Sequence, residues 1–314
     1  MAPRKLKIMV VAEEGAGAQM FRALAATNHE IAAVLTSNTN EPGETSLATI
    51  AARQGCQVWN ARLVKKASLA DDMRKAQVDL LLNVHSRYVV CNEVLAAARI
   101  GAFNMHPGPL PRYAGLNAVS WTIFHGEKTH GVTVHWMEPG IDTGPIAYQA
   151  MFPILPADTP LTLTHKCVTN GIPLLLELVR AASLDEQSIP RLPQNLAEQR
   201  YYGKEVPQQG RLVWNRPARD VADFVRACEY WPYPSPWGHP VTKFQGREFE
   251  VMRAARTGKR SDVSPGTVGE CSQSECLVAA ADEWIAVRQL KCDSRTIRPS
   301  EILRPGSLLG AAQA

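Results

Sequence analysis

Three polar side chains of this sequence have the types and spacing of a proton-transfer site. Asn104 and His106 lie two positions apart in FNMHPGPLPRYAG (103–115), so on a strand both project from the same face. The prolines that follow form a rigid, non-helical exit. Asp142 lies in the glycine-rich turn PGIDTG (139–144), where a carboxylate can be aimed without the constraints of a helix.

An amide, an imidazole and a carboxylate suit acyl transfer between neutral groups. The imidazole can take a proton from an attacking amine or give one to a leaving nitrogen. The amide NH2 can stabilise a developing oxyanion, and the carboxylate can orient the imidazole or relay protons. No serine or cysteine nucleophile accompanies them, so we expect direct attack by the substrate. Purely structural roles for the three residues are the alternative.

The elements around these residues alternate between strand-like and helix-like segments over residues 1–150. Near-continuous apolar runs such as 6–14 and 78–86 are typical of strands with both faces covered. This order predicts an α/β fold with a doubly wound, mostly parallel, Rossmann-like sheet. Ligands bind such sheets at the carboxyl ends of the strands, which directs attention to the residues after Ser86 and Phe103.

The second part of the chain has a different pattern. We expect a helix over 116–126, an antiparallel strand pair over 131–154 and a long helix over 161–183. Beyond a polar boundary, short strands separated by glycine and proline turns predict a small, OB-like β-barrel. The sequence therefore predicts a catalytic domain over 1–205 and a β-barrel domain over 206–314.

Composition and charge narrow the function further. The chain has 314 residues, of which 45% are apolar and 20% charged, enough to bury a core. A formal net charge of +4 favours anionic small molecules but is far from that of a nucleic-acid coat protein. No apolar run approaches the ~20 residues that cross a bilayer. The start of the chain is interpreted as a first strand rather than a signal peptide. We therefore expect a cytoplasmic protein without a membrane partner.

Cysteine and histidine spacings predict no metal centre. The seven cysteines are scattered, and Cys271 and Cys276 are the only close pair. We expect reduced thiols, with a disulfide or metal site at this pair as the alternative. His125, His130 and His135 recur every five residues but lack an HExxH motif or supporting carboxylates. Of these, His135 is expected to approach the active site from its strand.

A dinucleotide site is not expected. Gly15 and Gly17 supply half of a G-x-G-x-x-G fingerprint, but Met20 stands where a small residue should be. Glu41 is the only acidic candidate after the second strand. The aromatic run YWPYPSPWG (230–238) is interpreted as a proline-stiffened loop that seals the two domains, with a binding platform as the alternative.

Four motifs in the chain resemble those of the folate-dependent formyltransferases. They are N-x-H-P-x-x-L-P from Asn104, W-x-I-x-x-G from Trp121, G-V-T-x-x-x-M from Gly131 and D-T-G from Asp142. The strand-rich end from Val206 is similar to the C-terminal barrel of that family. The resemblance covers nearly the whole chain and implies an N-formyltransferase.

The resemblance also implies roles for individual residues. His106 would be the general base and acid, Asn104 would stabilise the oxyanion, and Asp142 would tune His106. The co-substrate would be 10-formyltetrahydrofolate, and no metal would be needed. Leu116 stands where some members have an arginine. The pterin would bind largely to backbone, in a pocket formed at Tyr88, Val89, Val90, Leu116, Glu138, Pro139, Gly140, Ile141 and Asp142.

The acceptor implied by the resemblance is the primary amine of a small molecule: an amino-sugar nucleotide, an amino acid or a carrier-bound amine. The flank PGPLPRYAGLNAVSW differs from the S-L-L-P-x-x-R-G-A-A-P of the tRNA enzymes, so methionyl-tRNA is the less favoured alternative. Hydrolysis of 10-formyltetrahydrofolate by water and a non-catalytic folate- or partner-binding module stay open. A cation cluster is interpreted as a solvated strand end, with an anionic-partner contact as the alternative; its members are Arg253, Arg256, Lys259 and Arg260.

Overall fold

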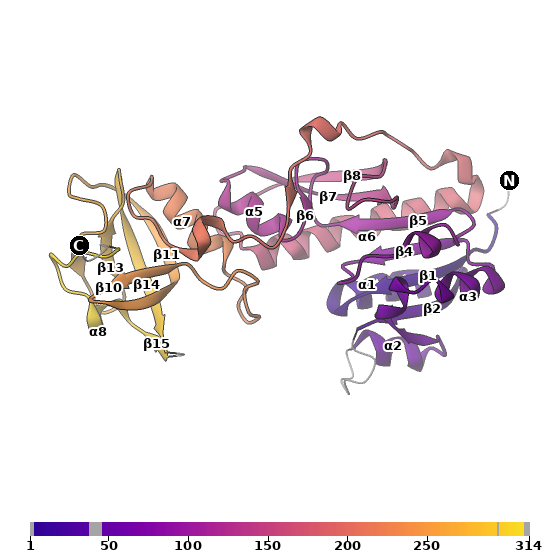
Figure 1. The fold of residues 1–314 in the computed structure, drawn as a ribbon, viewed down its shortest axis with the longest axis horizontal. Coiled ribbons are helices and arrows are strands. Elements are labelled where there is room, and N and C mark those ends of the chain that lie inside the picture. The colour runs from indigo at the N-terminus through magenta and orange to yellow at the C-terminus, as the bar shows by residue number, and fades with distance from the viewer. Residues whose placement is uncertain (1–2, 38–45, 294, 311–314) are drawn as a thin grey trace. The chain divides into compact units, whose positions relative to one another are not determined.

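The computed structural model describes residues 3–37, 46–293 and 295–310, which form two compact units (Figure 1). The units are interleaved along the chain, and the predicted division into 1–205 and 206–314 stays a prediction. Unit 1 comprises Met1–Gly115, His130–Phe152 and His165–Tyr201, and unit 2 comprises Leu116–Thr129, Pro153–Thr164 and Tyr202–Ala314.

Unit 1 is built on a seven-stranded sheet. Its strands, in spatial order, are β3 (Val58–Asn60), β2 (Glu30–Thr36), β1 (Lys7–Ala12), β4 (Leu80–Val84), β5 (Gly101–His106), β7 (Thr129–Trp136) and β8 (Ile146–Pro153). The first five run parallel, and β7 is antiparallel to β5. The Trp136 N–H donates to the Pro145 carbonyl and the Ile154 N–H to that of Lys128, so β7 and β8 are antiparallel too. The predicted α/β fold with a mostly parallel sheet is confirmed.

Helices cover the sheet because its strands are apolar on both faces. In β1, Ile8 to Val11 have no exposed surface. A Cβ at Gly17 in the first helix would lie 2.7 Å from Ala12 and from Leu47, so this helix packs closely on β1 and on the second helix. The helices are α1 (Glu14–Ala25), α2 (Leu47–Arg53), α3 (Ser68–Ala76), α4 (Asn92–Leu95) and α6 (Pro160–Leu184).

The α6 helix is apolar enough, by length and composition alone, to span a membrane. Half of that apolar stretch is nevertheless buried inside the protein, and Leu175 and Leu178 have no exposed surface. A Cβ at Gly171 would lie 2.5 Å from Met105 Sδ on β5 and 2.9 Å from Val132 on β7. This packing is that of a core helix, and it lies against the carboxyl end of β5. The cytoplasmic location stays a prediction.

Unit 2 combines helices with an antiparallel sheet, and this sheet is consistent with the predicted small barrel. Its helices are α5 (Ala118–Phe124), α7 (Ala218–Ala227) and α8 (Pro299–Ile302). Its sheet runs in the order β10 (Val241–Phe244), β11 (Arg247–Arg260), β14 (Glu283–Cys292), β13 (Cys276–Ala279) and β12 (Val268–Cys271), with β15 (Arg295–Ile297) also paired to β14.

The remaining short elements of the two units are β6 (Ala114–Gly115), β9 (Tyr201–Tyr202), η1 (Ala61–Lys65), η2 (Glu186–Ser188), η3 (Leu196–Glu198) and η4 (Pro207–Gly210).

Aromatic side chains form the centre of unit 2. The Trp121 ring of α5 stacks on Tyr202 at 4.6 Å and meets Trp237 edge-on at 4.8 Å. The aromatic run 230–238 has both buried and exposed side chains. Trp237 is 8% exposed, whereas Trp231 is 75% and Tyr233 is 65% exposed. The interpretation of this loop as a seal between domains stays a prediction.

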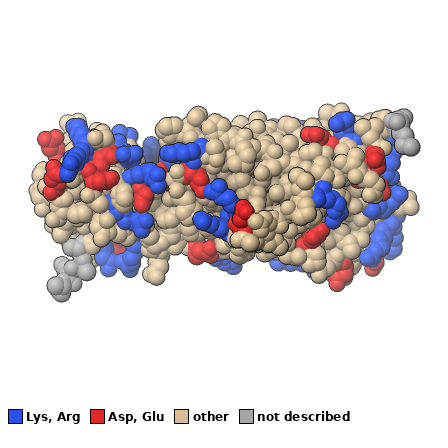
Figure 2. Space-filling view, turned by 90° about the horizontal axis from the view of Figure 1, so that it is seen from above, with Lys and Arg blue, Asp and Glu red and all other residues tan. Residues whose placement is uncertain are grey.

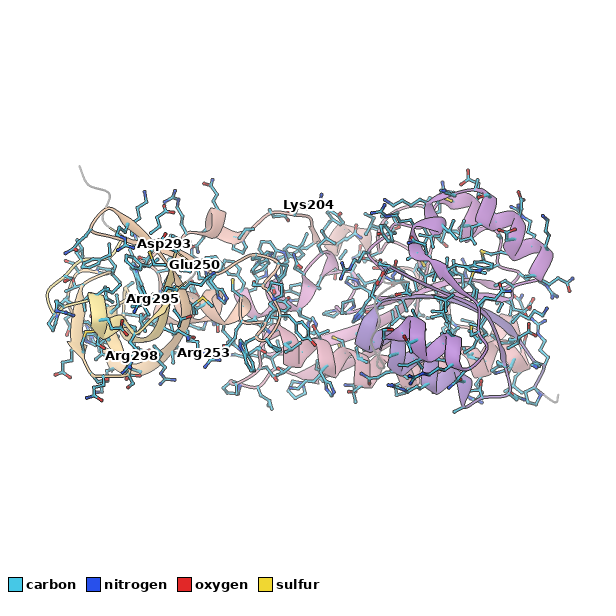
Figure 3. The ribbon with its side chains drawn as sticks, turned by 90° about the horizontal axis from the view of Figure 1, so that it is seen from below. Lys204, Glu250, Arg253, Asp293, Arg295 and Arg298 are labelled. Atoms are coloured by element: carbon cyan, nitrogen blue, oxygen red, sulfur yellow. A yellow bond between two sulfur atoms is a disulfide. The ribbon has the colours of Figure 1, made fainter. Side chains whose placement is uncertain are left out.

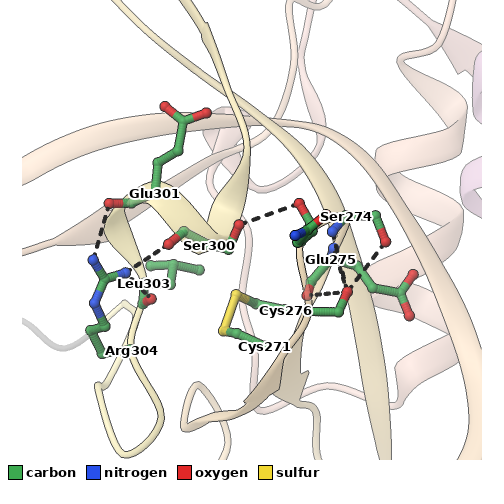
Figure 4. The surroundings of a disulfide bond; sticks show 10 residues. Cys271, Ser274, Glu275, Cys276, Ser300, Glu301, Leu303 and Arg304 are labelled. Atoms are coloured by element: carbon green, nitrogen blue, oxygen red, sulfur yellow. Dashed lines mark hydrogen bonds between the residues drawn. A yellow bond between two sulfur atoms is a disulfide. The ribbon is translucent and has the colours of Figure 1, made fainter.

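The expectation of reduced thiols is wrong for one pair, because Cys271 and Cys276 form a disulfide (Figure 4). The two residues are cross-strand partners in the hairpin of β12 and β13. The turn between them is closed by Ser272, whose hydroxyl accepts hydrogen bonds from the Ser274 and Glu275 N–H groups. Sequence spacing does not reveal this register. The other five cysteines are free thiols.

The cation cluster of unit 2 is largely paired. Arg256 lies 2.7 Å from Glu283, Arg260 lies 2.9 Å from Asp262, and Arg253 lies 3.4 Å from Glu229. Acidic and basic side chains are also interspersed over the face seen in Figure 2. Glu250 and Asp293, labelled in Figure 3, each lie 3.0 Å from a basic side chain, Lys291 and Arg247 respectively. This pairing agrees with a solvated strand end.

Candidate active site

The structure brings the three predicted catalytic residues together. The last residues of β5 carry Asn104 and His106, and Asp142 reaches both from the turn between β7 and β8. His106 Nδ1 lies 3.3 Å from Asp142 Oδ2, and Asn104 Nδ2 donates to Asp142 Oδ1 over 3.3 Å. His106 is 3% and Asp142 8% exposed. The amide and the imidazole therefore share one buried carboxylate.

The turn is shaped so that Asp142 faces β5. Asp142 itself has a φ of +56°, in the left-handed region. A Cβ at Gly144 would lie 2.0 Å from the Trp136 carbonyl oxygen, so only glycine lets the chain pass there. Gln194 ties the turn down, because its amide donates to the carbonyls of Asp142 and Gly144 over 2.9 and 2.6 Å.

The surroundings of Asp142 keep its carboxylate ionised. Burial alone would raise its pKa, but the His106 and His135 rings and the Gly115 N–H hold the pKa well below its usual range. The Gly115 N–H donates to Oδ2 over 2.8 Å. A buried negative charge is thus available to a protonated imidazole.

His106 is hydrogen-bonded through both ring nitrogens. Nε2 lies 2.6 Å from the Tyr113 carbonyl oxygen, and Nδ1 faces Asp142. Both partners are acceptors, so both ring nitrogens donate at once only when the ring is protonated. The Tyr113 carbonyl therefore occupies the hydrogen-bonding position of Nε2 in this structure.

His135 approaches the site from β7, as expected. Its Nε2 lies 3.1 Å from Asn104 Nδ2 and 3.3 Å from Asp142 Oδ1. The Asn104 amide thus has both of its hydrogens directed at His135 and Asp142. Its carbonyl oxygen accepts from Asn83 Nδ2 over 2.9 Å. The network fixes the orientation of Asn104, since O and N cannot be exchanged without losing these bonds.

Sequence reasoning missed Asn83, His85 and Tyr113. The first two end the apolar run VDLLLNVHS (78–86), and polar residues at the end of a buried strand are the signal that could have found them. Tyr113 contributes only its backbone carbonyl. A backbone contact leaves no signal in the residue type.

The other histidines have partners that are not metals. His130 Nε2 lies 3.1 Å from the Pro107 carbonyl oxygen, and burial lowers the pKa of His130 to about 4. His125 stacks on Trp121 at 5.6 Å. Over 3–37, 46–293 and 295–310, no cluster of His, Cys, Asp and Glu side chains has the arrangement of a metal site. Glu41, the acidic candidate for a dinucleotide, lies outside the described residues.

The residues predicted to bind the pterin lie in separate segments. Tyr88, Val89 and Val90 follow β4, and Val89 is 65% exposed. The run Glu138, Pro139, Gly140 and Ile141 precedes Asp142 in its turn, and Ile141 is 42% exposed. Leu116 belongs to unit 2 and is 46% exposed.

Two cavities lie in unit 2. They measure 380 and 440 Å³, and none of the predicted pterin residues lines either cavity. The first borders Trp214 and Lys243, and the second borders Cys271 and Arg288. Neither cavity is therefore part of the site predicted from the sequence.

Family models and solved structures match the chain over most of its length. The "Formyl transferase" model matches residues 6–179, and the "Formyl transferase, C-terminal domain" model matches residues 205–305. The N-formyltransferase from Helicobacter canadensis, solved with folinic acid and dTDP-3-aminofucose, is 16% identical; the match covers 90% of this chain and 99% of that one with a TM-score of 0.69.

Two other solved structures are similar. WlaRD, a sugar 3N-formyl transferase solved in the presence of dTDP and 5-N-formyl-THF, is 16% identical, with 91% of this chain and 98% of that chain covered and a TM-score of 0.70. HypX from Aquifex aeolicus with tetrahydrofolic acid is 18% identical, with 96% of this chain but 47% of HypX covered and a TM-score of 0.63. These likenesses show a shared fold. The matches of both family models show that this chain belongs to the formyl transferase family.

Proposed function

We propose that this formyltransferase moves the formyl group of 10-formyltetrahydrofolate to the primary amine of a small acceptor, with an amino-sugar nucleotide as the acceptor class. The observation that carries the proposal is the shared carboxylate. His106 Nδ1 lies 3.3 Å from the buried, ionised Asp142, and Asn104 donates to the same group. Such a set can hold and deliver a proton beside an amide donor.

In the proposed reaction, the amine nitrogen forms a bond to the formyl carbon, whose oxygen becomes an oxyanion. Asn104 and protonated His106 stabilise that oxyanion by hydrogen bonds. His106 and Asp142 then move a proton from the amine nitrogen to N10 of the folate. The bond between the formyl carbon and N10 breaks, which leaves tetrahydrofolate and an N-formylated amine. Atoms and charges balance without a covalent enzyme intermediate.

Two hydrogen bonds of the substrate-free site have to be exchanged before this reaction. Nε2 of His106 must leave the Tyr113 carbonyl, which it now contacts at 2.6 Å. One hydrogen of Asn104 must leave His135 or Asp142. New hydrogen bonds to the oxyanion offset the loss of these contacts, because a hydrogen bond to a charged group is roughly twice as strong as one between neutral groups.

We assign the folate site to the two predicted segments of unit 1, residues 88–90 and 138–142. Val89 and Ile141 are exposed apolar side chains on the two segments that flank the catalytic residues in sequence, and exposed apolar groups suit the faces of a flat ring. The solved relatives carry folinic acid, 5-N-formyl-THF or tetrahydrofolic acid. When bound, the folate would supply the formyl group, and the chain would supply orientation and protons.

The small acceptor is favoured by two observations. The Helicobacter canadensis relative was solved with dTDP-3-aminofucose and WlaRD is a sugar 3N-formyl transferase, and this chain covers 99% and 98% of them. The cations Arg253, Arg256 and Arg260 are each paired with an acidic side chain. Nucleic-acid affinity depends on unpaired clustered cations, so methionyl-tRNA is the weaker candidate.

The proposal is tested by turnover of the full-length protein with 10-formyltetrahydrofolate. Release of tetrahydrofolate is followed by absorbance with dTDP-3-aminofucose, methionine, methionyl-tRNA or no amine. We expect release that depends on the amino-sugar nucleotide and yields its N-formyl product. Equal release without any amine would instead identify a hydrolase, and release only with methionyl-tRNA would overturn the acceptor class.

A further inference from the structure

Two buried hydrogen-bonding atoms at the end of β4 lack partners. Asn83 Oδ1 and His85 Nε2 are shielded from water and have no hydrogen-bond partner among the described residues. Leaving a buried polar atom unpaired costs about 1–3 kcal/mol. Two such atoms only two residues apart call for an explanation. A bound ligand that forms hydrogen bonds with both atoms would remove this cost.

Both atoms lie where the fold is expected to bind a ligand. The strand order reverses between β1 and β4, and open α/β sheets bind ligands in the crevice at this point. The register pairs Val84 with Met105, so His85 follows beside His106 on the neighbouring strand. Asn83 is already joined to Asn104 through its Nδ2. The two unpartnered atoms therefore border the catalytic network.

The chemistry of both atoms is that of acceptors. The Asn83 amide donates its Nδ2 to Asn104, which leaves Oδ1 as a carbonyl acceptor. Burial and the nearby His106 lower the pKa of His85 to about 4, so its ring is neutral near pH 7. A neutral imidazole with its proton on Nδ1 has a free lone pair on Nε2. With His85 in this tautomer, a ligand that fits both atoms must supply hydrogen-bond donors.

We infer that Asn83 Oδ1 and His85 Nε2 hold the attacking amine of the acceptor by accepting its two N–H bonds. This inference rests on the proposed function and names the residues that receive its amine substrate. With both hydrogens held at the end of β4, the lone pair of the nitrogen is free to point at the formyl carbon beside His106. His85 thus contacts the substrate, whereas Asn83 both contacts the amine and holds Asn104.

The left-handed backbone of His85 calls for two different replacements. Its φ is +56°, a conformation that histidine adopts more readily than bulkier residues, so each replacement carries a backbone cost that its thermal unfolding curve measures. His85→Phe keeps a ring but removes the acceptor, and His85→Gln restores a polar group near the position of Nε2. His29→Phe is the matched control, because His29 precedes β2 and so lies at the amino end of the same sheet.

The experiment measures kcat/KM for dTDP-3-aminofucose, together with the Kd for 5-formyltetrahydrofolate, in the full-length protein. We expect His85→Phe to lower kcat/KM for the amine roughly tenfold or more, as loss of one hydrogen bond predicts, with the folate Kd unchanged. We expect His85→Gln to recover at least part of that loss and His29→Phe to retain wild-type kcat/KM.

The outcomes separate this inference from the proposed function. Wild-type kcat/KM in His85→Phe, or an equal loss of folate binding, overturns the amine site alone. A wild-type protein that binds no 5-formyltetrahydrofolate and formylates no amine overturns the proposed function instead. Thermal unfolding of His85→Phe shows whether the variant is folded, and a folded His85→Gln keeps the test decisive if it is not.

Discussion

At the scale of single residues, the pKa values of two buried histidines and one buried carboxylate are shifted in and around the site. Asp142 stays ionised because His106 and His135 lower its pKa. Burial drives His85 and His130 the other way, towards neutral rings with a pKa of about 4. Two buried histidine rings are thus neutral near pH 7, whereas the buried carboxylate of Asp142 carries a charge.

The neutral histidines predict a pH dependence of stability. The folded-state pKa of His85 and of His130 is about 4, below the value of about 6.5 in an unfolded chain. The unfolded state therefore binds protons first, and the free energy of unfolding falls as the pH drops from about 6.5 to about 4. Between about pH 7 and pH 5 each histidine contributes a loss of about 2 kcal/mol.

Urea unfolding at those two pH values measures this effect. The His85→Phe variant should lose less stability than the wild type over the same interval, because it has one titrating ring fewer. Asp142 affects the free energy of unfolding at lower pH. Because its pKa is lowered in the folded state, its contribution to stability is lost only as the pH falls below about 4. Equal or higher stability of the wild type at about pH 5 would contradict the assignment of neutral rings.

The residue types Asn104, His106 and Asp142 were predictable because a motif carries their spacing. The roles of Asn83 and His85 were not predictable, because the apolar run predicts a strand but says nothing about the polar residues at its end. The Tyr113 carbonyl was beyond prediction, since backbone contacts depend on how the chain folds after His106.

At the scale of elements, the turn between β7 and β8 decides whether Asp142 reaches β5. Gly144 lies against the carbonyl of Trp136, where an added Cβ would be 2.0 Å away. A backbone atom cannot move aside as a side chain can. The geometry of the site is thus built into one close approach of two backbone segments.

We expect Gly144→Ala to lower kcat at least tenfold, because the turn must shift and move Asp142 from His106; a 1 Å misplacement can cost about a hundredfold. Turnover with 10-formyltetrahydrofolate and the best acceptor measures the loss. Gly15→Ala is the control, since a Cβ there meets nothing within 4 Å and alanine favours α1. Equal kcat in the two variants would show that the turn is not a constraint.

Strand and helix types could be predicted from periodicity, but pairing could not. The apolar runs identified β1 and β4, yet no local pattern shows that the order reverses between them. The disulfide was misjudged for the same reason, because cross-strand register brings Cys271 opposite Cys276. Long-range pairing is decided by tertiary packing, which local propensity does not encode.

At the scale of the whole molecule, the two units exchange segments along the chain. Unit 2 includes α5, whose Phe124 packs on Phe224 of α7 at 5.3 Å and whose Ser120 lies 2.8 Å from the Tyr230 hydroxyl. Cutting the chain between residues 205 and 206 leaves α5 without these partners. The helix over 116–126 was predicted, but its partner in space was not, and the predicted domain over 1–205 separates it from α7.

We therefore expect residues 1–205 alone to unfold at least 5 °C below the full chain and to aggregate, since loss of a few kcal/mol shifts Tm by several degrees. Buried Trp121 and half-buried Phe124 would be uncovered, and exposed apolar patches promote association. Differential scanning calorimetry and size-exclusion chromatography measure both effects. A monomeric fragment with the Tm of the full chain would instead support a domain boundary at 205.

The most direct test of the account is the rate of tetrahydrofolate release by His106→Ala with 10-formyltetrahydrofolate and the best acceptor at saturation. Removing the imidazole takes away the proton carrier and one oxyanion donor, so we predict a fall in kcat of about 10²–10⁴-fold. The Kd for 5-formyltetrahydrofolate and the thermal unfolding curve should stay close to the wild type. A folded His106→Ala that transfers formyl groups at the wild-type rate would contradict the account.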